Sequence, residues 1–161
     1  MVKRNTVKLD IRNNTPFPMM YHNMHFGSGR VADHFSWPKV INKNENHTIV
    51  CYERDWALSG CSGYVQYVMN GNIVTIAFSN PSAGTNKVGV GVQETGESVW
   101  DNISSHDYQD FQIDIKVGNV PVIVHCKCSG GTTNEASVVF HLPYSYQQNN
   151  QPCPPGYSPY P

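Results

Sequence analysis

The chain has 161 residues and a formal net charge of −1, and charged residues make up only 14% of it. This length suits one compact domain, and the near-neutral charge excludes strong non-specific attraction to nucleic acid or anionic lipid, so we expect no nucleic-acid partner. No stretch approaches the ~20 apolar residues of a membrane-spanning helix. The N-terminus, MVKRNTVKLD, lacks the apolar run of a signal peptide.

Alternation of apolar and polar residues predicts β-strands along most of the chain. The first strand begins near Thr6 and contains Val7, Leu9 and Ile11, before a turn at 13–18. Further strands are predicted at 19–26, 47–52, 64–69, 73–78, 87–92, 111–117, 120–127 and 136–142. Short strands with turns at regular spacing predict an all-β sandwich.

Two local patterns add detail to this sandwich. Asn-Gly-Asn at 70–72, between two apolar runs, predicts a tight hairpin. In KVGVGV (87–92), alternate glycines leave one strand face bare, which indicates that another element packs closely there. The segment 95–105 has helical character, with Ser98 as its predicted N-cap and Val99 on its apolar face. We expect this short helix to pack on the glycine face.

Five cysteines leave the cellular compartment open. Cys126 and Cys128 lie two residues apart on a predicted strand, with Cα atoms ~6.6 Å apart. That separation is at the far limit for a disulfide, so we expect no bond between them. Cys51, Cys61 and Cys153 remain as disulfide partners, and we expect neither a metal site nor a cofactor.

The last segment of the chain differs in composition from the rest. Residues 143–161 are rich in Pro, Gln, Asn and Tyr and show no periodicity, so we expect a sandwich domain at 1–142 followed by an extended tail. Within the tail, PPGY (154–157) is similar to the ligands of WW domains. Such four-residue matches arise by chance in segments of this composition, so we favour a tail that mediates contacts between copies of the chain, through Cys153 among other residues.

A set of segments carries a resemblance to a known family. In chain order they are FGSG (26–29), WPKV (37–40), SGCSGYVQYVMNGNIVTIAFSNP (59–81), NKVGVGV (86–92), SVWDNI (98–103) and NEASVVFHL (134–142). They resemble the actinoporins, the sphingomyelin-binding pore-formers of sea anemones, and the fungal fruit-body lectins of similar fold. The resemblance implies an actinoporin-like β-sandwich with one short helix packed on a sheet.

The resemblance also implies a ligand pocket. Carried over position by position, its residues are Ser28, Ser62, Ser79, Pro81, Trp100 and Tyr108. The family cages choline with several aromatic rings, but the loop that carries such rings is 82–85 here, without an aromatic residue, and serines stand at 104–105, where tyrosines are expected. A pocket of hydroxyls with one aromatic ring suits a sugar. The alternatives are that the serines form ordinary turns and that Trp100 is a core residue.

Actinoporins carry an amphipathic helix before the first strand, and that helix lines the pore. Here about five residues precede Thr6, which at ~1.5 Å per residue span under ~10 Å against a ~30 Å hydrocarbon core. We therefore expect adhesion rather than pore formation by such a helix.

Three functions remain open. The first is a lectin that recognises cell-surface glycans, as a homo-oligomer whose weak sites act together. The second is a cytolysin or a binder of phosphocholine lipid head groups, and the third is a structural protein whose tail recruits partners. We expect no enzyme, because the sequence has no nucleophile–histidine–acid pattern and no phosphate-binding glycine loop. We expect the protein to act outside the cell, with the cytoplasm as the alternative.

Overall fold

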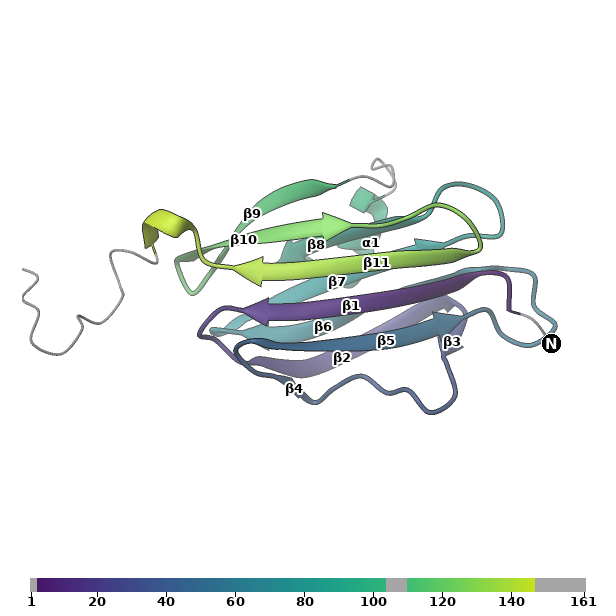
Figure 1. The fold of residues 1–161 in the computed structure, drawn as a ribbon, viewed down its shortest axis with the longest axis horizontal. Coiled ribbons are helices and arrows are strands. Elements are labelled where there is room, and N and C mark those ends of the chain that lie inside the picture. The colour runs from purple at the N-terminus through teal and green to yellow at the C-terminus, as the bar shows by residue number, and fades with distance from the viewer. Residues whose placement is uncertain (1–2, 104–109, 147–161) are drawn as a thin grey trace, which may run out of the picture.

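The computed structural model describes residues 3–103 and 110–146, which form two stacked β-sheets (Figure 1). Sheet A has six strands in the order β3-β5-β1-β11-β10-β9, and sheet B has five in the order β4-β2-β6-β7-β8. Sheet A consists of β1 (Thr6–Asn14), β3 (Arg30–Val31), β5 (Glu45–Tyr52), β9 (Phe111–Val117), β10 (Val120–Lys127) and β11 (Thr133–His141). Sheet B consists of β2 (Met19–Ser28), β4 (Val40–Ile41), β6 (Cys61–Met69), β7 (Asn72–Asn80) and β8 (Lys87–Val92). The predicted all-β sandwich is confirmed.

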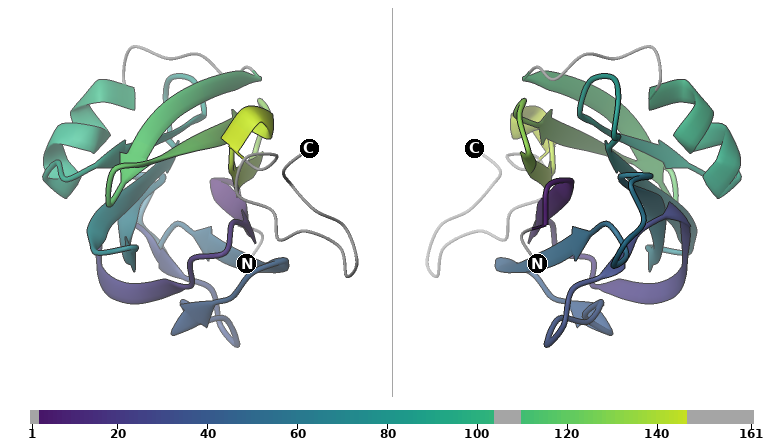
Figure 2. Two further views of the ribbon diagram at one scale, coloured as in Figure 1. Left: turned by 90° about the vertical axis from the view of Figure 1, so that its left-hand side faces the viewer. Right: turned by 90° about the vertical axis from the view of Figure 1, so that its right-hand side faces the viewer.

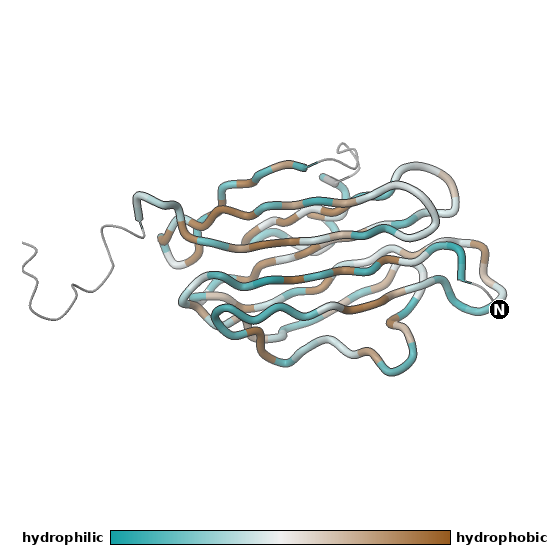
Figure 3. Tube along the Cα trace, in the orientation of Figure 1, coloured by the Kyte–Doolittle hydropathy of each residue, from teal (hydrophilic) through white to brown (hydrophobic). Residues whose placement is uncertain are grey.

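The core lies between the sheets and follows the alternation of the sequence. Apolar and polar residues alternate along the strands of sheet A (Figure 3), and Val7, Leu9 and Ile11 of β1 are fully buried. In the middle of sheet A, β1 pairs in parallel with β11 and antiparallel with β5. This parallel pair joins the first and last strands of the sandwich.

In sheet B, β6 and β7 are largely buried on both faces because a helix covers part of the outer side of the sheet. The helix α1 (Gly96–Ile103) packs on β6, β7 and β8, and Figure 2 shows it outside the sandwich. A Cβ atom added to Gly91 would lie 2.5 Å from Cγ2 of Val99, so the bare glycine face is the seat of the helix, as predicted. The predicted N-cap is wrong, however. The hydroxyl of Thr95 accepts a hydrogen bond from the Ser98 backbone N–H at 3.1 Å, so Thr95 is the cap.

The predicted turns agree with the structure at the tight hairpins. Asn70 and Gly71 connect β6 to β7 with φ of 47° and 81°, the left-handed conformation that the Asn-Gly pair favours. The strand predicted at 19–26 is longer in the structure, because β2 continues through a bulge to Ser28 before Gly29, with φ of 87°, leads into β3. The two-residue strands β3 and β4 were not predicted, since they are too short to show alternation.

Buried asparagines connect the two sheets at one end of the sandwich. Asn80 on β7 donates from Nδ2 to the carbonyl of Thr6 at 2.9 Å, at the start of β1. Asn134 on β11 donates from Nδ2 to the carbonyls of Ser79 at 2.9 Å and Lys87 at 3.3 Å. These bonds fix the ends of β7 and β8 against sheet A. We call this the Thr6 end of the sandwich.

Two further observations concern cysteines and membrane spans. Cys51, Cys61, Cys126 and Cys128 are all buried. Cys153, with most of the predicted tail, lies outside the described residues, so its pairing and the domain boundary after 142 stay predictions. Within 3–103 and 110–146, the structure has no helix that is long and apolar enough to cross a membrane.

Candidate ligand-binding site

The serines singled out from the sequence form a row across sheet B near the Thr6 end. The strand register places Ser28 opposite Ser62 and Ser62 opposite Ser79, and Ser79 is in turn opposite Lys87. The hydroxyl oxygens of Ser28 and Ser62 are 3.0 Å apart, within hydrogen-bond distance. Because directly paired residues share a sheet face, the row lies on the outer side of the sheet, which also carries α1.

Trp100 lines two hollows beside this row. One has a volume of about 140 Å³ and is lined by His25, Gly27, Ser62, Gly63, Tyr64, Glu97 and Trp100. The other has a volume of about 220 Å³ and is lined by Ser79, Pro81, Ala83, Gly84, Thr85, Lys87, Trp100 and Asp101. We call them the Tyr64 hollow and the Pro81 hollow, and together the Trp100 site. At ~30 Å³ per water molecule, these volumes fit a small head group rather than an extended ligand.

The Tyr64 hollow combines an aromatic ring with a carboxylate. The hydroxyl of Tyr64 donates to Oε1 of Glu97 at 3.0 Å. The pKa of Tyr64 is raised, mainly by burial and to a lesser extent by this hydrogen bond. The pKa of Glu97 is lowered, mainly by its own backbone N–H and to a lesser extent by the Tyr64 hydroxyl. Glu97 is therefore ionised at neutral pH. A Cβ atom on Gly96 would lie 2.1 Å from Cζ of Tyr64, so the glycine allows the ring to lie against the helix.

The Pro81 hollow has a different chemistry. It offers the hydroxyls of Ser79 and Thr85 together with the side chain of Lys87, and Asp101 lies on its wall. Ser79 is only 5% exposed. Because Asn134 binds the backbone carbonyls of Ser79 and Lys87, both residues are held in place by the opposite sheet.

The structure brings most of the predicted site residues together. Ser62, Ser79, Pro81 and Trp100 line the two hollows. Ser28 lines neither hollow and reaches the site through the hydroxyl of Ser62. Tyr108, like the serines at 104–105, lies outside the described residues.

Trp100 was expected to be either a core residue or a ligand-binding residue, and the structure supports a part of each interpretation. Its ring is partly buried and packs on the cluster of Tyr64, Ala77 and Val99, so it anchors the helix. The same residue lines both hollows, so it also offers a surface to a ligand.

Sequence reasoning missed Tyr64, Glu97 and Lys87. Period-two alternation from Ser62 puts Tyr64 on the same face of β6, a signal that was present in the sequence. The position of Glu97 depends on how α1 sits on the sheet. Lys87 could be placed only once the register of β7 and β8 was known.

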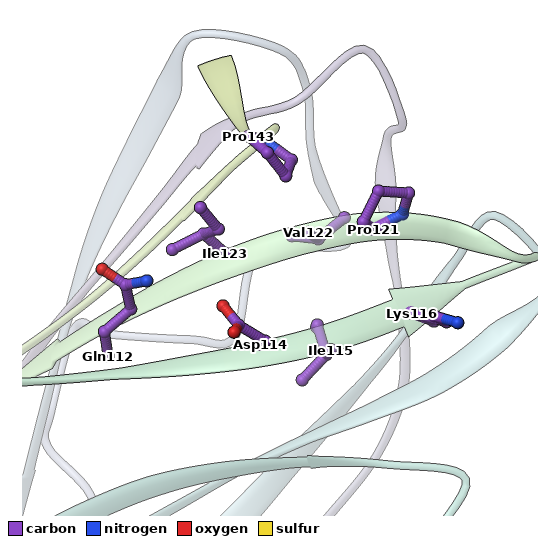
Figure 4. Close-up of a pocket in the computed structure, with 8 residues that line it drawn as sticks. All are labelled: Gln112, Asp114, Ile115, Lys116, Pro121, Val122, Ile123 and Pro143. Atoms are coloured by element: carbon purple, nitrogen blue, oxygen red, sulfur yellow. The ribbon is translucent and has the colours of Figure 1, made fainter. Parts of the chain in front are cut away.

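A larger hollow, of about 610 Å³, lies elsewhere, along β9 and β10. Figure 4 shows Asp114 and Ile123 side by side on these strands, with Pro143 nearby, in agreement with their pairing in the sheet. No predicted site residue lines it, and it lacks an aromatic ring. The described residues contain no cluster of three or more His, Cys, Asp or Glu side chains that would hold a metal ion. The Trp100 site is therefore the candidate with convergent chemistry.

Comparison with known proteins supplies the fold. No protein-family model and no curated protein sequence matches the chain. Among solved structures, the lipid-binding protein Nakanori is similar over 88% of this chain and 72% of its own, with a TM-score of 0.72 and 18% identity. The Xerocomus chrysenteron lectin XCL is similar over 84% of this chain and 99% of its own, with a TM-score of 0.55 and 11% identity. The RahU protein, solved in complex with a TRIS molecule, is similar over 88% of this chain and 97% of its own, with a TM-score of 0.53 and 9% identity. The chain thus has the actinoporin-like fold that the sequence resemblance implied.

Proposed function

We propose that this chain binds a polar head group at a cell surface, and that the Trp100 site takes the phosphocholine group of a membrane lipid. The observation that carries this proposal is the charge on the two sides of Trp100. Glu97 lines the Tyr64 hollow, whereas Lys87 lines the Pro81 hollow. A zwitterionic group lying across the ring would meet a carboxylate at one end and an ammonium at the other.

The quaternary ammonium belongs in the Tyr64 hollow. Trp and Tyr rings attract such cations through their π faces, and Trp100 and Tyr64 both line this hollow. The ionised carboxylate of Glu97 adds a negative charge beside them. The sequence offered one aromatic ring, and Tyr64 is a second, which makes choline a better fit than the sequence alone indicated.

The phosphate belongs in the Pro81 hollow. Lys87 supplies a positive charge, and the hydroxyls of Ser79 and Thr85 supply hydrogen-bond donors. Asp101 lines this hollow as well, so its carboxylate lies in the same hollow as Lys87. The similarity in fold to Nakanori, which is described as a lipid-binding protein, supports this assignment.

A glycan is the second candidate, favoured by the row of serines. Sugars need paired hydrogen bonds and one flat apolar surface. The hydroxyls of Ser62 and Ser79 on either side of the Trp100 ring, with two carboxylates nearby, provide both. The fold similarity to a fungal lectin supports this candidate.

One experiment separates the two candidates. The protein is sedimented with vesicles of phosphatidylcholine and sphingomyelin, with soluble phosphocholine as competitor, and the same preparation is applied to a glycan array. We expect vesicle binding that phosphocholine competes, reduced about 2- to 30-fold in Trp100→Ala, the range of one cation–π contact. Trp100→Phe, which keeps a ring, should retain most of the binding. Binding that ignores phosphocholine but is competed by an array sugar would favour the glycan, and binding unchanged in Trp100→Ala would locate the site elsewhere.

We also propose that the protein is non-catalytic and acts outside the cell, since both candidate ligands lie on cell surfaces. Assembly into a homo-oligomer would let several weak sites act together. Size-exclusion chromatography with light scattering tests this assembly, and a monomer at working concentration would contradict it.

A further inference from the structure

The loop between β5 and β6, residues 53–60, carries two strongly exposed apolar side chains. Trp56 is 88% exposed and Leu58 is 82% exposed, the highest values among the large apolar side chains that the structure describes. They lie two residues apart at the tip of the loop. Isolated exposed apolar residues are ordinary, but a Trp and a Leu together on one projecting loop form an apolar tip.

The base of this loop is fixed to the body of the protein. The buried carboxylate of Glu53 accepts hydrogen bonds from the backbone N–H of Arg4 at 3.2 Å and from Nδ2 of Asn5 at 2.8 Å. Two residues further along, Asp55 forms an ion pair with Lys3. The loop is thus anchored to the N-terminal segment immediately before its apolar tip.

The tip itself is a defined turn. The backbone N–H of Ala57 donates to the carbonyl of Arg54 at 3.1 Å, which closes the turn around Trp56. Trp56 has a φ of 62°, in the left-handed region that bulky residues rarely adopt. A conformation that is unfavourable for the residue, and that keeps a large ring in water, indicates that presenting the ring outward has a use.

The loop is continuous with the Trp100 site. A Cβ atom on Gly60, its last residue, would lie 2.7 Å from the backbone N of Ser82 and 2.8 Å from the carbonyl oxygen of Asn80. The end of the loop therefore packs directly on the turn that carries Pro81. Figure 1 shows the segment beyond β5 at the end of the sandwich marked N, which is the Thr6 end.

We propose that the 53–60 loop is a membrane anchor, in which Trp56 and Leu58 enter the interfacial region of a phospholipid bilayer while the Trp100 site holds a lipid head group. This inference rests on the lipid function proposed above. Trp is favoured at the boundary between head groups and hydrocarbon, where its ring is half apolar and half polar. Arg54, exposed beside the tip and bonded from Nε to the carbonyl of Gly29 at 3.3 Å, places a cation at the level of the lipid phosphates.

A bilayer is a better partner for the apolar tip than a groove on another protein. The 82–85 loop, which lines the Pro81 hollow, has no aromatic residue. A ligand attached to a membrane brings the bilayer surface against every loop that borders the site. The 53–60 loop borders the site at Pro81 and supplies the apolar side chains that the 82–85 loop lacks.

The test compares the double variant Trp56→Ala/Leu58→Ala with the wild type. Tyr144→Ala is the matched control, because Tyr144 is 74% exposed and follows β11 at the opposite end of the sandwich. Binding is measured to phosphatidylcholine–sphingomyelin vesicles and, separately, to soluble phosphocholine. We expect the double variant to lose vesicle affinity by at least about tenfold, as the burial of one or two apolar side chains would give. Its affinity for soluble phosphocholine, and both affinities of Tyr144→Ala, should be unchanged.

The outcomes separate this inference from the proposed function. If the double variant keeps full vesicle affinity, the anchor is wrong and the head-group site stands. If the wild type binds neither vesicles nor phosphocholine, the proposed function fails and the anchor fails with it. A direct readout uses brominated phosphatidylcholine, which quenches tryptophans that enter the bilayer. Quenching in the wild type that disappears in Trp56→Phe supports insertion, and equal quenching in both proteins contradicts it.

Discussion

Replacement of Asn134 by alanine tests how the two sheets are fixed beneath the site. Asn134 is fully buried, and its side chain donates to the carbonyls of Ser79 and Lys87 and accepts from the backbone N–H of Ser129 at 3.2 Å. Asn134→Ala removes one buried and two partly buried hydrogen bonds and leaves three backbone groups without this partner. At about 1 kcal/mol per group, the free energy of unfolding should fall by about 3 kcal/mol.

Urea unfolding followed by circular dichroism measures this loss. With a denaturant slope of ~2 kcal/mol/M, the midpoint should fall by about 1.5 M at an unchanged slope. Glu135→Ala, an exposed neighbour on the same strand, should change the unfolding free energy by less than ~0.5 kcal/mol. A loss below about 1 kcal/mol in Asn134→Ala would refute the role of this residue.

A charged variant extends the same test. Asn134→Asp places a carboxylate against two carbonyl oxygens, which raises the pKa of the new side chain in the folded state. The penalty is absent below the unfolded pKa of ~3.9 and grows as the pH rises through it. When the two proteins are compared at the same pH, the unfolding free energy of Asn134→Asp should therefore approach that of the wild type only in acid solution.

Three further predictions concern the helix, the thiols and the carboxylate of the site. Gly91→Ala should displace α1 and weaken phosphocholine binding, which titration calorimetry can measure. The added substitution Val99→Ala removes the clashing Cγ2 atom and should restore much of the binding affinity. Burial raises the pKa of Cys61 and of Cys126 to about 12, so both thiols should resist Ellman's reagent at pH 8 and react fully in urea. Fast labelling of either thiol in the folded protein would contradict its buried position. The backbone N–H of Glu97 and the Tyr64 hydroxyl hold the pKa of Glu97 below its ordinary value of 4.5. The affinity for glycerophosphocholine, a phosphodiester whose charge does not change in this range, should therefore stay constant from pH 7 to about 5 and fall only in more acid solution, and a decline already near pH 6 would exclude Glu97 as the titrating group.

The elements with the strongest local signals could be predicted from the sequence. The Asn-Gly pair at 70–71 determined a hairpin whose conformation it favours, and the bare glycines of β8 indicated the seat of a helix. Both depend on residues close together in the chain. Thr95 was passed over as the N-cap in favour of Ser98 because both hydroxyl residues precede plausible helical turns, and only the hydrogen bond distinguishes them.

The arrangement of the strands could not be predicted in the same way. The parallel pair of β1 and β11 joins strands more than a hundred residues apart, and its alternation would equally suit an antiparallel partner. The pairing of Ser28 with Ser62 likewise depends on long-range register, whereas the Asn-Gly hairpin itself sets Ser62 opposite Ser79. The family resemblance supplied these three residues, while Glu97 escaped because its meeting with Tyr64 depends on where the helix rests on the sheet.

An NMR titration with soluble phosphocholine tests whether a lipid head group binds at the Trp100 site. Binding there should shift the Trp100 indole N–H and the backbone amides of Ser62, Gly63 and Lys87, and these shifts should saturate together. Shifts that cluster around Asp114 and Ile123 on β9 and β10, or no shifts at saturating phosphocholine, would contradict it.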